Sequence, residues 1–311
     1  MIEYKVGEAK MNNNNIVETS NAKNMNKAIM KDINSGIAPE HVAKVRDQIA
    51  AIVEKNLKTK LRNPQTYIFT IGIPVIFTIM LFFIFGTIEI IPGWRIYDVC
   101  ISGMLIYAAS LGATNAATIL TDEKSKGTLK RLDTTGVKRS TIFLSMVISE
   151  SILMAIQILI IFVIGYGMLG LRWHEYNPLL LVIGYLIILF FGISTLGIGV
   201  IISAYAKAAD SANGITMMYT MPILYMSGVF TPFESAIQYF TPPFWANALY
   251  KQLVVFGHNF WTDFVQVSSA DPFVAEYLPI PLWGAFLIVL GILAVVLFIG
   301  IKLFQKKTNL E

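Results

Sequence analysis

The sequence predicts an all-α integral membrane protein with six transmembrane helices. Two observations carry this prediction: 55% of the 311 residues are hydrophobic, and the mean hydropathy is +0.61. Both values exceed those of a soluble domain with a hydrated surface. A third is the distribution of charge, because charged residues gather between long apolar stretches. We expect those stretches to cross the bilayer, whose core of about 30 Å requires about 20 apolar residues in a helix.

Two segments precede the first apolar stretch. Residues 1–41 are rich in Asn, Lys and Ser and are predicted to form a disordered cytoplasmic tail. Residues 42–66 place apolar side chains at helical spacing with basic residues on the other faces, and Asn63-Pro64 is expected to end the helix. We interpret this segment as an interface helix on the lipids of the inner leaflet, with packing against another protein as the alternative.

The six predicted spans are residues 67–88, 97–120, 142–169, 178–202, 214–230 and 281–304. The fifth is short and contains Pro222. With six spans, one compartment receives 21 Lys and Arg residues and the other only Arg95, Arg172 and Lys251. By the positive-inside rule, both termini, including residues 307–311, are predicted to be cytoplasmic in a plasma membrane protein.

A charged loop, TDEKSKGTLKRLDTTGVKRS, occupies residues 121–140 between the second and third spans, and nine of its twenty residues are charged. At about 3 kcal/mol per charge at the bilayer centre, it must lie in water. On the other side, residues 231–280 form the one long external segment, whose first half is apolar and aromatic but interrupted by Pro232, Pro242 and Pro243. We expect it to form a re-entrant pair of short helices that dips into the outer leaflet.

The sequence offers no catalytic, cofactor-binding or metal-binding constellation. His41, His174 and His258 fall in separate segments, and Cys100 is the single cysteine. The chain has no phosphate-binding G-x-x-x-x-G-K-[ST] loop, so we do not expect it to bind and hydrolyse nucleotide by such a loop, and we expect that it is not an enzyme. Nor do we expect a nucleic-acid partner.

Candidate residues for a translocation path lie in two spans. Glu150 is the main ionisable residue within the spans, with Gln157 two turns away on the same face. It could line a polar path or anchor the structure. Met217, Met221 and Tyr225 form a stripe on the fifth span, which could line a path for apolar cargo or pack against a neighbouring helix.

Three motifs resemble the type-2 ABC exporter permeases of the multidrug and polysaccharide-export kind. They are RNP before the first span, DEKSKGTLKRL followed by TGVKRS between spans two and three, and MSGVFTPFES after span five. The resemblance covers about residues 45–306, with a transmembrane domain at 67–306. Family loops vary around E-x-x-x-G-T-x-x-x-L, which is matched here by Glu123, Gly127, Thr128 and Leu132.

The resemblance implies that ATP and Mg are bound by a partner nucleotide-binding subunit, and that two permease copies, identical or different, form the path. It also implies that the charged loop contains a coupling helix that docks on the ATPase. There, Leu129 and Leu132 would form an apolar ridge among charges. Transport direction is likewise implied by the resemblance. The alternatives are a non-transporting subunit that transmits ATPase motion to an external partner, and an ion-coupled carrier, which the scarcity of intramembrane charge disfavours.

Overall fold

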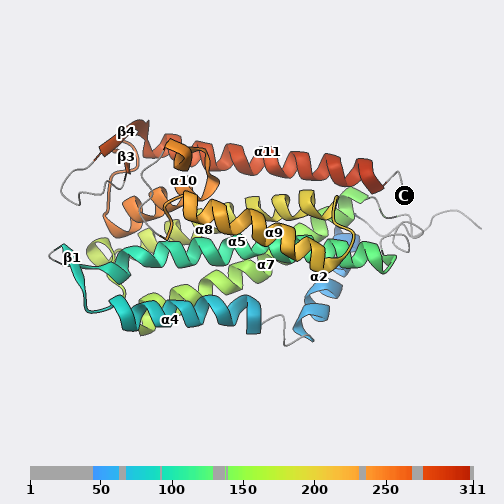
Figure 1. The fold of residues 1–311 in the computed structure, drawn as a ribbon, viewed down its shortest axis with the longest axis horizontal. Coiled ribbons are helices and arrows are strands. Elements are labelled where there is room, and N and C mark those ends of the chain that lie inside the picture. The colour runs from blue at the N-terminus through green and yellow to red at the C-terminus, as the bar shows by residue number, and fades with distance from the viewer. Residues whose placement is uncertain are drawn as a thin grey trace, which may run out of the picture. The chain divides into compact units, whose positions relative to one another are not determined.

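A computed structural model describes residues 45–62, 68–91, 93–128, 137, 139–230, 236–267 and 276–308 (Figure 1). The predicted tail at 1–41 lies outside these ranges. Long helices dominate, and their bounds are α2 (Val45–Leu61), α4 (Ile73–Phe85), α5 (Ile96–Ser125), α7 (Arg139–Phe162), α8 (Pro178–Ser203), α9 (Ala209–Met226), α10 (Pro242–Tyr250) and α11 (Leu282–Thr308). Shorter helical turns are η1 (Ile68–Gly72), η2 (Val163–Met168), η3 (His174–Tyr176), η4 (Ala236–Phe240) and η5 (Lys251–Val255).

Four helices in the described ranges are long and apolar enough to cross a membrane. They are Ile96–Ser125, Ser140–Met168, Pro178–Ser203 and Leu282–Leu303, at the positions of the second, third, fourth and sixth predicted spans. The protein therefore has the helical membrane fold that the sequence predicts. At the first predicted span the apolar helix Thr70–Phe85 is shorter. At the fifth, α9 includes Asp210 near its start and Pro222 inside it. These two spans stay predictions.

Helix α5 forms the centre of the bundle and packs against α4, α7, α8 and α9 (Figure 1). Small residues allow its neighbours to approach closely. Thr195 of α8 donates a 3.0 Å hydrogen bond to the carbonyl oxygen of Ala109. A Cβ atom added at Gly199 would lie 2.2 Å from the carbonyl oxygen of Ala113. The small residues of α8 therefore bring two helix backbones into contact.

Helix α2 packs along α7, and its Ile52 is buried in the main apolar core. Residues 45–61 are thus helical within the segment predicted to be amphipathic. Its position at the membrane interface stays a prediction.

Two short antiparallel hairpins lie at one end of the bundle, opposite α2 (Figure 1). The first joins β1 (Glu89–Ile91) to β2 (Trp94–Arg95), with Gly93 at φ +92° in the turn. The second joins β3 (Phe264–Val267) to β4 (Glu276–Pro281). Between the predicted fifth and sixth spans, α10 continues into η5 and packs against α8 and α11. Short helices are present there, whereas their re-entry into the membrane stays a prediction.

Candidate functional site

The segment predicted to contact an ATPase begins as the last turn of α5. This helix continues to Ser125, past the predicted end of the span at residue 120, so Glu123 is helical. Gly127 follows with φ +68°, a left-handed conformation that favours glycine and ends helices. Thr128 comes directly after this turn. The predicted ridge residues Leu129 and Leu132 lie outside the described residues.

Glu123 connects α5 to α2. Its Oε1 accepts a 2.7 Å hydrogen bond from Lys55 Nζ. The Lys55 side chain is 43% exposed and that of Glu123 18% exposed, so the pair is partly hydrated and contributes little to stability. It nevertheless places the end of α5 in direct contact with α2.

Glu150 is buried in α7, and it is paired. Only 3% of its side chain is exposed, and its Oε2 lies 2.5 Å from Nζ of Lys60, the last basic residue within α2. One turn earlier on α2, Asn56 donates a 3.3 Å hydrogen bond to Ser149 Oγ. The helix predicted to present its basic residues to lipid headgroups therefore directs Lys60 at a carboxylate of the bundle.

Gln157 is 3% exposed, and its amide nitrogen donates to two backbone carbonyl oxygens, those of Thr70 at 2.9 Å and Ala108 at 3.4 Å. Glu150 and Gln157 line one cavity of about 120 Å³ between α2, η1, α5 and α7. The structure thus brings together these two predicted path residues.

The other three predicted path residues lie on α9. Met217 and Met221 are half-buried, and Tyr225 is 56% exposed and contacts Phe230. None of them is among the residues that line the Glu150 cavity. The predicted path residues therefore form two groups, and a shared path through both stays a prediction.

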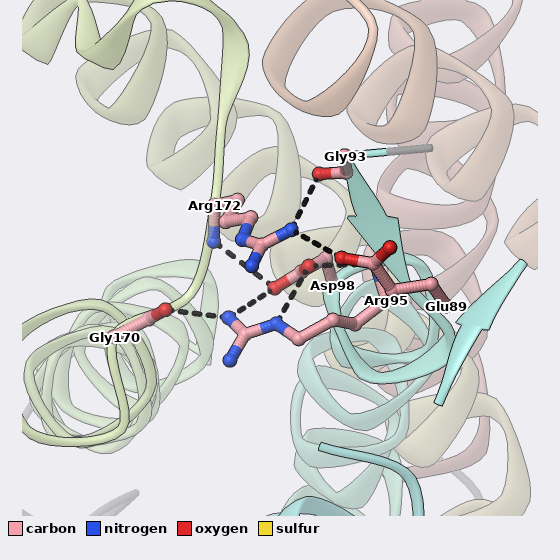
Figure 2. A network of polar contacts seen from close by, with 6 residues as sticks. All are labelled: Glu89, Gly93, Arg95, Asp98, Gly170 and Arg172. Atoms are coloured by element: carbon pink, nitrogen blue, oxygen red, sulfur yellow. Dashed lines mark hydrogen bonds and ion pairs between the residues drawn. The ribbon is translucent and has the colours of Figure 1, made fainter. Parts of the chain in front are cut away.

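A polar network that was not predicted from the sequence lies at the opposite end of α5 (Figure 2). Asp98, in the first turn of this helix, is fully buried. Its carboxylate accepts hydrogen bonds from the Arg95 backbone and guanidinium at 2.8 to 3.0 Å, and from the Arg172 backbone at 3.0 Å. The hydrogen bonds to Asp98 raise the pKa of Arg95. The available signal was an acid placed three residues after an arginine at the start of an apolar helix.

The arginines of this network also bind the surrounding loops. Arg95 donates to the carbonyl oxygen of Gly170, and Arg172 donates to that of Gly93 at 2.8 Å and to Glu89 at 3.1 Å (Figure 2). The network therefore joins the β1–β2 hairpin to the loop between α7 and α8.

The structure brings together two of the histidine segments that the sequence analysis treated as separate. A Cβ atom at Gly257 would lie 2.1 Å from the ring of His174, so the His174 turn packs against the segment that leads to His258. His258 Nδ1 lies 3.2 Å from Asp263 Oδ2. Among the described residues, no group of three or more His, Cys, Asp or Glu side chains could hold a metal ion.

Comparison with known protein families finds a family that matches most of the chain. The ABC-2 type transporter family matches residues 47–261, which is more than half of the chain. The match includes the polar contacts around Glu150 and those around Asp98. No curated protein matches the sequence. Members of this family are transmembrane subunits, which typically work with an ATP-binding subunit. The protein is therefore a membrane permease that belongs to the ABC-2 type transporter family.

Proposed function

We propose that this chain is the transmembrane subunit of an ATP-driven exporter. It moves a lipophilic or lipid-linked substrate across the plasma membrane, with ATP and Mg bound by a separate nucleotide-binding subunit and a second permease copy completing the path. Six spans would put both termini on the same side of the membrane, and the distribution of basic residues supports the cytoplasmic side. The observation that carries the proposal is the polar end of α5, where the family loop begins and Glu123 contacts α2.

The sequence supports ATP hydrolysis by a partner subunit, because the chain has no phosphate-binding loop of its own. The charged residues at 121–140 supply a hydrated surface for that partner. The distribution of basic residues supports a cytoplasmic location for the same surface, where ATP is available.

The position of α5 suggests how a conformational change of the ATPase would be transmitted to the helix bundle. This helix packs against α4, α7, α8, α9 and α10, so its displacement must shift their packed side chains as well. Packed interfaces move between discrete arrangements and do not deform continuously. We infer that movement of the loop after Gly127 rotates α5 as a rigid body, and that the Lys55–Glu123 contact carries α2 with it.

The test is co-expression of the permease with the nucleotide-binding subunit encoded nearest to it, followed by reconstitution into vesicles. We expect co-purification and ATP-dependent movement of a lipophilic substrate. The double substitution Leu129→Ser, Leu132→Ser should abolish co-purification. Leu179→Ser is the matched control, because this leucine is 62% exposed in the first turn of α8, which is external in the predicted topology.

Three results would contradict parts of this proposal. Intact co-purification of the double variant would remove the leucine ridge as the docking element. ATP hydrolysis in the complex without movement of any substrate would favour the subunit that only transmits motion. Substrate movement that requires an ion gradient and no ATP would favour the ion-coupled carrier.

A further inference from the structure

The cavity beside Glu150 combines a polar interior with an apolar rim. Its volume is about 120 Å³, enough for several water molecules or a small head group. The polar lining residues are Lys60, Thr70, Asn115, Glu150 and Gln157. The apolar lining residues are Leu61, Ile71, Leu153, Met154 and Ile156. Such a lining suits an amphiphilic ligand, whose polar head would contact the polar residues and whose apolar tail would contact the apolar ones.

Several hydrogen-bond acceptors of the cavity lining remain available to a ligand. Glu150 Oε2 is bound to Lys60, and Glu150 Oε1 receives no hydrogen bond from the described residues. The donors of Gln157 are directed at backbone carbonyl oxygens, which leaves its Oε1 as an acceptor. The Asn115 side chain, which has no hydrogen bond within the described ranges, adds an amide oxygen and an NH₂ group. A group rich in N–H donors, such as an ammonium, complements this set.

The rim of the cavity opens toward the surface of the bundle. Leu61 is 67% exposed and Ile156 is 47% exposed, and both line the cavity. Leu61 is the last residue of α2, the helix that precedes the first predicted span. In the predicted topology this opening lies at the level of the inner leaflet, where the apolar tail of a ligand would stay in contact with lipid.

Lys60 occupies the position that a ligand ammonium would take. Its side chain is 12% exposed. Its ammonium is carried by a flexible four-carbon stem near the end of α2. A buried ion pair has a large desolvation penalty, which is avoided when one ammonium replaces another on the same carboxylate. Lys60 can then turn its charge toward water, as neighbouring Lys58, 64% exposed, already does.

We propose that this cavity binds the ammonium head of a lipophilic amine, with Glu150 as its counter-ion and Lys60 as the tethered ammonium that the ligand displaces. That the bound amine is a transported substrate rests on the proposed function. Binding of the amine can be measured on the permease alone. The ammonium could belong to a transported amine or to an aminophospholipid of the membrane.

The test measures binding of dodecylamine to the purified full-length permease in phosphatidylcholine nanodiscs. We expect Glu150→Gln to weaken binding about tenfold to a hundredfold, since a charge-assisted hydrogen bond is lost. Lys60→Met should tighten binding several-fold, because the competing ammonium is removed while the apolar stem stays. Glu89→Gln, which removes an exposed acid at the opposite end of the bundle, should leave binding unchanged. Each variant is first checked for its thermal midpoint, and the double variant Lys60→Met, Glu150→Gln, which contains no unpaired buried charge, repeats the measurement if Glu150→Gln does not fold.

Ligand chemistry gives independent outcomes. Dodecanol and dodecyl phosphate should bind at least tenfold more weakly than dodecylamine. Equal affinity of the three ligands, or equal affinity of the wild type and Glu150→Gln, would overturn the proposal, as would weaker binding to Lys60→Met. If phosphatidylethanolamine in the nanodisc competes with dodecylamine in the wild type and not in Glu150→Gln, the occupant is the lipid head group. Absence of this competition assigns the site to a free amine.

The proposed function fails separately from this inference. Retained dodecylamine binding together with no ATP-dependent transport by the assembled complex would refute the exporter and leave the site in place. ATP-dependent transport of another substrate with no dodecylamine binding would refute the site and leave the exporter in place.

Discussion

Replacing Asp98 by Asn should be among the most damaging single changes in the described part of the protein. The carboxylate is fully buried and accepts hydrogen bonds from both Arg95 and Arg172 (Figure 2). Asparagine has nearly the same volume, but it replaces one acceptor oxygen by an NH₂ group that faces N–H donors. The Arg95 guanidinium would then lose its counter-ion, and a buried donor would lose its acceptor.

The expected loss of stability follows from the burial of the Arg95–Asp98 ion pair. Removing one partner of a buried, hydrogen-bonded ion pair costs about 3–5 kcal/mol. For a chain of this size, each kcal/mol lowers the melting temperature by about 2–4 °C, so we expect a decrease of about 6–20 °C. Glu89→Gln is the matched control in the same network, because Glu89 is 51% exposed and its partner Arg172 is 37% exposed. An exposed pair contributes at most about 1 kcal/mol.

The assay is thermal unfolding of the purified protein in one detergent, followed by intrinsic tryptophan fluorescence at a fixed scan rate, because membrane proteins often unfold irreversibly. Raising the salt concentration should reduce the effect of Glu89→Gln and leave that of Asp98→Asn nearly unchanged, since buried pairs are screened much less. Equal midpoints for the two variants would refute the reasoning, because the buried carboxylate would then contribute no more than an exposed one.

Three further predictions concern packing and the external loops. Gly199→Ala should destabilise the protein by about 1–3 kcal/mol, because its Cβ would overlap a backbone carbonyl of α5, whereas Gly291→Ala, with open space around it, should not lower the thermal midpoint. Gly257→Ala should destabilise the external loops by at least about 1 kcal/mol in the same assay, since it has φ +70° and no room for a Cβ. Hydrogen bonds from the Asn259 backbone N–H and the Thr262 hydroxyl lower the pKa of Asp263. The carboxylate therefore stabilises the folded protein above about pH 4, and this stabilisation is lost as the pH falls further. An acid titration followed by tryptophan fluorescence should show this step in the wild type and lack it in Asp263→Asn.

The long apolar helices could be predicted from hydropathy, but their ends could not. Hydropathy marks where the chain leaves the membrane, whereas a helix continues as long as its backbone hydrogen bonds and side chains permit. Residues 121–125 are polar and remain helical, so α5 continues five residues beyond its predicted span. The left-handed Gly127 is the physical reason for the end of this helix, and its position could be identified in the sequence.

The polar contacts between distant segments could not be predicted. Asp98 accepts a hydrogen bond from a residue 74 positions away, and Lys60 binds a glutamate 90 positions away. A single sequence shows that these charges exist near the ends of apolar helices, but not which of them meet. The two hairpins were missed for a related reason, because strands as short as Trp94–Arg95 have too few residues to show alternation.

The basic face of α2 is predicted to lie against lipid headgroups, and the contacts of this helix indicate a second role. Lys55 binds Glu123 at the end of α5, whereas Asn56 and Lys60, one turn apart, bind α7. One short helix therefore contacts both the loop proposed to meet the ATPase and the cavity proposed to bind an amine. A ligand that displaces Lys60 would leave α2 with fewer contacts to α7 and its contact to α5 intact. By reciprocity, a movement of α5 that pulls α2 away from α7 would also change the affinity of the cavity for its ligand.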